Sequence, residues 1–205
     1  DSVQPDSVVV LSDLTIPIGR LRVGAVPAAR TPFPVQTLRV DGGSTESVTR
    51  RLAGLPGVTL SNQTGSPYQS DLRLRGFALS PIVGVPQGVS VFVDGVRVNE
   101  ADASQVHLSL IPGGAVDRVE LLRGPVGAFG KNALGGALNF VTARGGEDTS
   151  VSVEAEVGSY GSVAGTVRAG GRRDAYDGFF AASYGRSNGW RELGHSQELS
   201  VFGKI

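Results

Sequence analysis

The sequence has 205 residues, with 19 basic and 19 acidic side chains and no cysteine. The absence of cysteine excludes a disulfide framework, a thiolate metal site and a cysteine nucleophile. The balanced charge, with no basic run, argues against nucleic acid as a partner. The 30 glycines and the short apolar runs are typical of β-structure with many tight turns. No stretch approaches the ~18 apolar residues of a transmembrane helix.

The first 42 residues contain few structural signals. An isolated β-prone run at residues 8–11 lies between polar residues, and a proline-rich stretch at residues 21–42 predicts extended chain with two short strands. Terminal segments of this kind are often poorly tied to the rest of a domain. The two short strands are expected around residues 21–23 and 36–40.

Residues 44–55 give the clearest helix signal. Val48, Leu52 and Leu55 are spaced by four and then three residues, which places them on one face of a helix. Pro56 follows directly and favours an end to the helix there. We expect this helix to pack its apolar face on a small sheet.

Short β-prone segments separated by turns follow the helix. Asp94 and Gly95, between two apolar runs, are a strong hairpin signal, and alternating leucine and arginine at residues 72–76 predict a half-buried strand. Together the segments predict a small α+β domain with a mixed sheet. The expected strands cover residues 58–60, 72–76, 89–98 (as a hairpin), 116–122 and 137–142, with helical turns at 103–110 and 126–131.

From residue 146 onward, every segment alternates apolar and polar side chains. Four such strands, with small apolar side chains on one face and polar ones on the other, fit the wall of a membrane β-barrel. A soluble sandwich shows the same alternation, but its inner face would need bulkier side chains. Pairing Val157 with Val163 keeps the apolar side chains on one face, so we expect an odd-length turn at residues 159–161.

Signals for catalysis are weak. The glycine-rich run at residues 124–132 lacks the spacing and the hydroxyl residue of a phosphate loop. His107 and His195 lie in different regions without neighbouring metal ligands, and Glu154 and Glu156 share the polar face of one strand. A solvated lumen accounts for that acidic pair. We therefore expect neither an enzyme nor a bound cofactor.

Five segments resemble, in the same order, the motifs of the plug domain of TonB-dependent outer-membrane receptors. A sixth segment, SNGWR at residues 187–191, resembles a motif that follows the third barrel strand in many members. The five segments are LAGLPGV at 52–58, LRLRGF at 72–77, VFVDGV at 91–96, VDRVELLRGP at 116–125 and GKNALGGALNFVT at 130–142.

The resemblance implies an N-terminal TonB-box segment (residues 1–20), an α+β plug domain (residues 21–145) and the first antiparallel strands of a transmembrane β-barrel (residues 146–205). The chain would lie in the bacterial outer membrane, in contact with its lipid. The family's barrels have about 22 strands, so four strands indicate a fragment. The implied function is energised import, most often of a ferric siderophore. The alternative is a soluble, secreted β-rich binding module; a hydrolase is disfavoured by the shortage of histidine and cysteine.

The resemblance also assigns residues to roles. TonB, the periplasmic partner, would add a strand to the TonB box. Arg75 and Arg123 would pair with barrel glutamates and lock the plug in the lumen. Outward-facing plug loops would contact the substrate, with Tyr68, Gln69 and Gln87 as the candidates. The TonB-box residues are Asp6, Ser7, Val8, Val9 and Val10.

Overall fold

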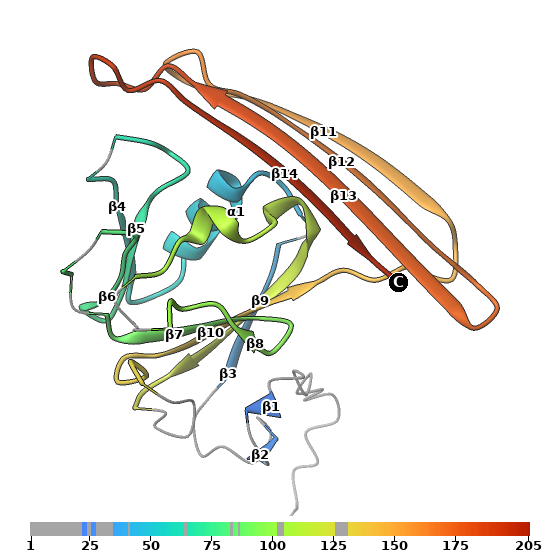
Figure 1. Ribbon diagram of the computed structural model, residues 1–205, viewed down its shortest axis with the longest axis horizontal. Coiled ribbons are helices and arrows are strands. Elements are labelled where there is room, and N and C mark those ends of the chain that lie inside the picture. Colours follow the sequence, from blue (N-terminus) through green and yellow to red (C-terminus); the bar gives the residue numbers. More distant parts are fainter. Residues whose placement is uncertain are drawn as a thin grey trace, which may run out of the picture.

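The structure is a computed structural model, and it describes residues 22–23, 26–27, 35–40, 42–63, 65–82, 84–85, 87–101, 105–125 and 131–205. An α+β unit, which we call the body (residues 35–142), lies against the concave side of a long curved sheet, which we call the wall (Figure 1). The wall consists of β11 (Ser150–Val157), β12 (Val163–Arg173), β13 (Tyr176–Ser187) and β14 (Ser196–Lys204).

The body is built on a five-stranded mixed sheet with the order β3-β9-β10-β7-β8. The last of its strands in the chain, β10, lies at the centre, antiparallel to β9 and parallel to β7. The first, β3, is an edge strand that pairs only with β9 in this sheet. The strands are β3 (Val35–Arg39), β7 (Val89–Val93), β8 (Val96–Arg97), β9 (Val116–Arg123) and β10 (Gly136–Thr142).

Smaller elements complete the body. A three-stranded antiparallel sheet with the order β4-β5-β6 lies beside the main sheet (Figure 1). Before the body, β1 (Arg22–Val23) and β2 (Val26–Pro27) pair with each other. The remaining elements are α1 (Thr45–Ala53), β4 (Val58–Ser61), β5 (Asp71–Leu74), β6 (Phe77–Leu79) and the 3-10 turns η2 (Leu108–Leu110) and η3 (Gly113–Ala115).

The core forms where α1 and the strands bring their apolar faces together. Val48 and Leu52 of α1 are buried beside Leu74, Leu121 and Phe140. Burying a side chain of this size stabilises the fold by roughly 1.5–3 kcal/mol. The predicted helix is confirmed, although it ends at Ala53.

Two hairpin turns in the body use left-handed backbone conformations. Asp94 (φ 49°) and Gly95 (φ 84°) connect β7 to β8, which confirms the predicted hairpin. Arg75 (φ 53°) and Gly76 (φ 90°) connect β5 to β6 in the same way. The strand predicted over residues 72–76 therefore ends at Leu74, because Gly76 adopts a positive φ that reverses the chain.

The register of the first wall hairpin agrees with the sequence. Val157 pairs with Val163, and the Gly158 amide donates to the Ser162 carbonyl at 2.8 Å. These two pairs leave a three-residue tip at residues 159–161. The predicted register and turn length are confirmed.

The two faces of the wall differ in character. Apolar side chains on the outer face are exposed, among them Val153, Val167 and Val201. The inner face, against the body, buries Thr166 and Ala181. No second sheet covers the outer face in the part of the chain described, so the sandwich alternative is not observed. The predicted α+β body followed by an incomplete antiparallel wall is confirmed.

The helices of the body are short. Within the described ranges, none is long and apolar enough to cross a membrane.

Candidate functional site

The interface between the body and the wall is the main candidate site. At its centre, Ala115 of η3 packs against Phe179 and Ala181 of β13. A Cβ added to Gly114 would lie 3.1 Å from Cγ2 of Thr166, so glycine allows the body to approach the wall closely. Small residues on both sides therefore let the backbone of η3 approach the wall strands closely.

Polar contacts flank this apolar centre. The Ser44 amide and hydroxyl each lie 3.4 Å from a carboxylate oxygen of Glu156 on β11. The Arg168 guanidinium of β12 lies over the ring of Phe179, at 5.4 Å from its centroid. It also lies so close to Gly42 that a Cβ there would be 2.8 Å from it. The wall thus presents both charge signs to the body.

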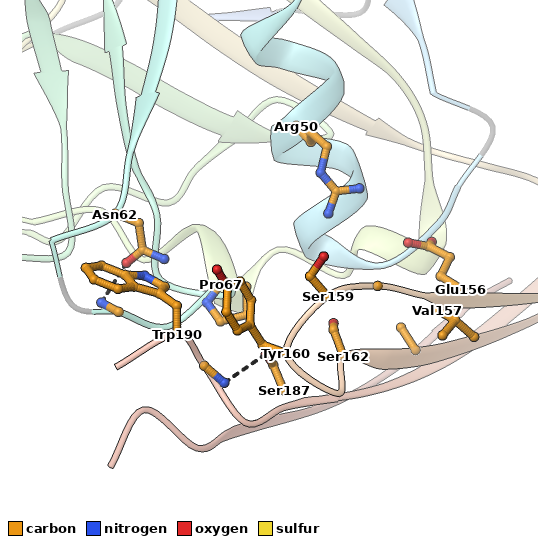
Figure 2. Close-up of a pocket in the computed structure, with 14 residues that line it drawn as sticks. Arg50, Asn62, Pro67, Glu156, Val157, Ser159, Tyr160, Ser162, Ser187 and Trp190 are labelled. Carbon is orange, nitrogen blue, oxygen red and sulfur yellow. Dashed lines mark hydrogen bonds between the residues drawn. The ribbon is translucent and has the colours of Figure 1, made fainter. Parts of the chain in front are cut away.

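One cavity, of about 470 Å³, opens where the turn after β11 and the loop after β13 meet the body. We call this the loop-end cavity. Figure 2 shows Arg50 extending from α1 toward the turn that holds Ser159, with Asn62 and Trp190 at the other end of the cavity. The body and the wall both line it, so a molecule bound there would contact both.

Two residues, Asn62 and Arg191, order the rim of the loop-end cavity. Asn62 Oδ1 accepts a hydrogen bond from the Gly65 amide at 2.7 Å, and Asn62 Nδ2 donates to the Ser66 carbonyl at 3.0 Å. From the wall, Arg191 stacks on Trp190 at 4.4 Å from the ring centroid and donates to the Gln63 carbonyl at 3.2 Å. The wall loop at residues 188–195 is therefore tied to the body.

The lining of the loop-end cavity combines charge with aromatic surface. Arg50 and Glu156 supply opposite charges, and Tyr160 and Trp190 are both more than half exposed. A guanidinium suits carboxylate or other anionic oxygen groups, and rings supply flat apolar surface. The cavity is therefore suited to a ligand that carries anionic groups together with planar or apolar parts.

A second contact lies at the opposite end, where residues 143–149 lead from β10 into β11; we call this the crossing end. Lys204 Nζ of β14 donates to Asp94 Oδ2 at 2.8 Å and to Thr142 Oγ1 at 2.9 Å. Asp94 also accepts from the Thr142 amide at 2.9 Å and from its hydroxyl at 2.5 Å. A polar cavity of about 560 Å³ adjoins these groups.

The environment of Asp94 favours its charged form. Burial alone raises the pKa of Asp94, but the hydrogen bonds from Lys204 and Thr142, with the charge of Lys204, bring it below its ordinary value of 3.8. Behind the turn, the Gly95 amide donates to Asn139 at 3.1 Å, and Asn139 donates to buried Glu120 at 3.0 Å. The hairpin is thus fixed on both sides.

The predicted substrate residues do not lie together at the loop-end cavity. Tyr68 is buried, and a Cβ on Gly185 of β13 would lie 2.6 Å from its hydroxyl. Gln87 uses its amide within the loop, accepting from the Ser80 amide at 3.0 Å. Gln69 is exposed. None of these three is among the described residues that line the cavity.

The predicted lock residues differ in their surroundings. Arg75 is exposed in its turn, whereas Arg123 is half-buried and donates through Nη2 to Gln36 Oε1. The Arg123 Nε is buried and has no hydrogen-bond partner among the described residues. Neither arginine pairs with a carboxylate of the four described wall strands. The predicted TonB box at residues 6–10 lies outside the described residues.

Several interface residues did not emerge as site candidates from the sequence. In the sequence, Lys204 is one polar residue of an alternating segment, and Asp94 is part of a turn signal. Trp190 and Arg191 lie in the SNGWR segment that carries part of the resemblance, which was the one signal available for them. Among the described residues, no group of three potential ligands could hold a metal ion.

Comparison with known families identifies the body. Residues 24–137, more than half of the chain, match the family described as the TonB-dependent Receptor Plug Domain. The matched range contains all of β3 through β9 and the start of β10.

Solved structures resemble both the body and the wall. The ferric yersiniabactin uptake receptor FyuA from Yersinia pestis is 26% identical, with 78% of this chain and 25% of that chain covered at a TM-score of 0.55. The alcaligin outer membrane receptor FauA from Bordetella pertussis is 18% identical, with 90% of this chain and 31% of that chain covered at a TM-score of 0.59. The ferric-catecholate import receptor Fiu from E. coli K12 is 20% identical, with 78% of this chain and 22% of that chain covered at a TM-score of 0.55. The chain thus spans less than a third of these proteins.

Proposed function

Because this chain belongs to the TonB-dependent receptors, with the body as its plug domain, we propose that the intact protein imports a ferric siderophore or a similar metal chelate across the outer membrane. Members of this family are transporters rather than enzymes, so the expectation of no catalytic activity is confirmed. The family also places the chain in the bacterial outer membrane.

One observation carries the proposal: the plug and the wall jointly line the loop-end cavity. A ligand bound between Arg50 of the plug and Trp190 of the wall would contact both parts at once, and so could favour one arrangement of the plug relative to the wall. Differential binding of this kind is what couples a ligand to a conformational change. The names of similar receptors, for ferric yersiniabactin and ferric catecholates, support a metal chelate as this ligand.

The remaining partners follow from the same assignment. The exposed valines of the wall face lipid, as the outer face of a membrane barrel requires. TonB adds a strand to the segment Asp6–Val10, as in other β-addition complexes. The buried, unpartnered Nε of Arg123 supports an acceptor from a part of the barrel beyond these four strands.

The test is uptake of radioactive iron by cells that express the intact receptor. Ferric yersiniabactin, ferric alcaligin and a ferric catecholate serve as probes, each in a host with and without TonB. We expect accumulation of at least one complex, lost in the host that lacks TonB. Accumulation that persists without TonB would overturn the energised mechanism, and no accumulation of any ferric complex would overturn the substrate class.

The TonB box is tested by removing main-chain donors. Val8→Pro and Val9→Pro each delete one amide, and neighbouring amides of a strand point to opposite edges, so one of the two variants should lose uptake. Val8→Ala and Val9→Ala keep the amides and serve as matched controls. Full uptake in both proline variants would place the TonB contact elsewhere.

A further inference from the structure

Three side chains from three elements meet at the crossing end. Asp94 comes from the β7–β8 turn, Thr142 from the end of β10, and Lys204 from the wall strand β14. Each hydrogen-bonds to the other two, at distances of 2.5 to 2.9 Å. The contact therefore joins the plug sheet to the wall through a charged pair and a hydroxyl.

The hairpin that carries Asp94 is itself rigidly held. The Asp94 amide donates to the Phe140 carbonyl at 2.9 Å, and Asn139 holds the Gly95 amide. β7 pairs with β10 over five residues. A pull on Asp94 is therefore transmitted to the central strands of the plug sheet.

The strength of the contact comes from its environment. The side chains of Lys204 and Asp94 are about a quarter to a third exposed, so water screens the pair less than it would a fully exposed pair. Hydrogen bonds to charged groups are stronger than neutral ones. By comparison, the contacts of Ser44 with Glu156, at 3.4 Å, lie near the limit of hydrogen bonding.

We propose that Asp94, Thr142 and Lys204 form an anchor that holds the plug sheet on the wall at the crossing end and sets how readily the plug separates from the wall. The proposal rests on the proposed function only in taking the body as a plug inside a barrel. It needs neither the ligand nor TonB.

The test measures separation of the plug from the wall in the intact receptor, purified in detergent. Ala115 is fully buried against Phe179 and Ala181, so Ala115→Cys places a protected thiol at the interface. These 205 residues contain no cysteine, and any cysteine elsewhere in the intact receptor is first replaced by serine. The rate of reaction with a maleimide then reports opening of the interface, and Ala181→Cys, on the wall side, provides a second reporter should the first variant fold poorly.

We expect Lys204→Gln and Asp94→Asn each to raise the labelling rate by about three- to tenfold, the range for a partly exposed charged hydrogen bond. Lys204→Arg should restore protection, because a guanidinium can reach both acceptors. Lys131→Gln is the matched control: it removes the chain's other lysine, which is exposed on the plug.

The pair must also act as one contact. The double variant Asp94→Asn with Lys204→Gln should label no faster than either single variant. Unchanged labelling in both single variants, additive effects in the double variant, or an equal increase in Lys131→Gln would each overturn the anchor. If the receptor imports none of the ferric complexes but the labelling rates change as expected here, the proposed function is wrong and the anchor stands.

Discussion

Arg191 and Gln63 are 128 residues apart, yet the Arg191 guanidinium donates to the Gln63 carbonyl at 3.2 Å. The contact ties the wall loop at residues 188–195 to a plug loop on the rim of the loop-end cavity. Stacking on Trp190 holds the guanidinium in place. The rim is thus ordered before any ligand arrives.

Arg191→Ala should weaken ligand binding by about two- to tenfold, because the ligand must then order the loop itself. Binding is measured by quenching of intrinsic fluorescence with whichever ferric complex the receptor imports. Leu193→Ala, at an almost fully exposed position in the same loop, is the control and should bind normally. Equal affinities for all three proteins would show that this contact does not prepare the cavity.

Asp94→Asn should lower thermal stability at neutral pH but not in acid. The folded-state pKa of Asp94 lies below its ordinary value of 3.8, so its contribution is complete above that value and is lost as the pH falls through the lower folded pKa. The melting temperatures of wild type and variant should converge there. Asp174→Asn, in an exposed turn with φ 55°, controls for the substitution; a difference that persists in acid would contradict the assignment.

Gly113→Ala should destabilise the plug by about 1–3 kcal/mol, the usual cost of overpacking. A Cβ at this position would lie 2.6 Å from the Thr45 amide nitrogen, at the start of α1. Gly203→Ala adds the same methyl group where nothing lies within 4 Å and should be neutral. Denaturant unfolding of the intact receptor compares them, and equal midpoints would mean that η3 can shift to accommodate the methyl group.

Val167→Arg should reduce the amount of folded receptor in the outer membrane. Val167 lies near the middle of β12 on the outer face, where an arginine in lipid costs about 2–4 kcal/mol. Val96→Arg makes the same change at an exposed position of the plug and should be tolerated. The heat-dependent shift on a detergent gel measures the folded fraction. Normal amounts of Val167→Arg would argue that this face does not meet lipid.

Local signals predicted much of the fold. The Asp94–Gly95 turn, the helix and the pairing of Val157 with Val163 each depend on residues close in sequence. The alternation of apolar and polar residues after residue 146 also predicts which side chains of a wall strand share a face. Predicting such features requires only the spacing of apolar residues and the residue preferences of turns.

Long-range contacts could not be predicted in this way. Asp94 and Lys204 are separated by 110 residues, and each alone resembles an ordinary exposed charge. Tyr68 appeared suited to a ligand-facing loop, but its ring is buried against Gly185. The strand predicted through Arg75 ended early because Gly76 offered a turn. Pairings of this kind depend on the packed layers, which a single sequence does not reveal.

The crossing from plug to wall is short and closely packed. The Ala143 amide donates to the Ala115 carbonyl at 2.8 Å, and a Cβ on Gly145 would lie 2.1 Å from the Gly171 carbonyl oxygen. Arg144 also pairs with Asp177 at 3.5 Å. A connecting segment held in this way keeps the plug and the wall at a high effective concentration relative to each other. The connection therefore fixes the direction in which the first wall strand leaves the plug. The orientation of the plug against the wall is set by this connection and does not have to be found separately when the receptor folds.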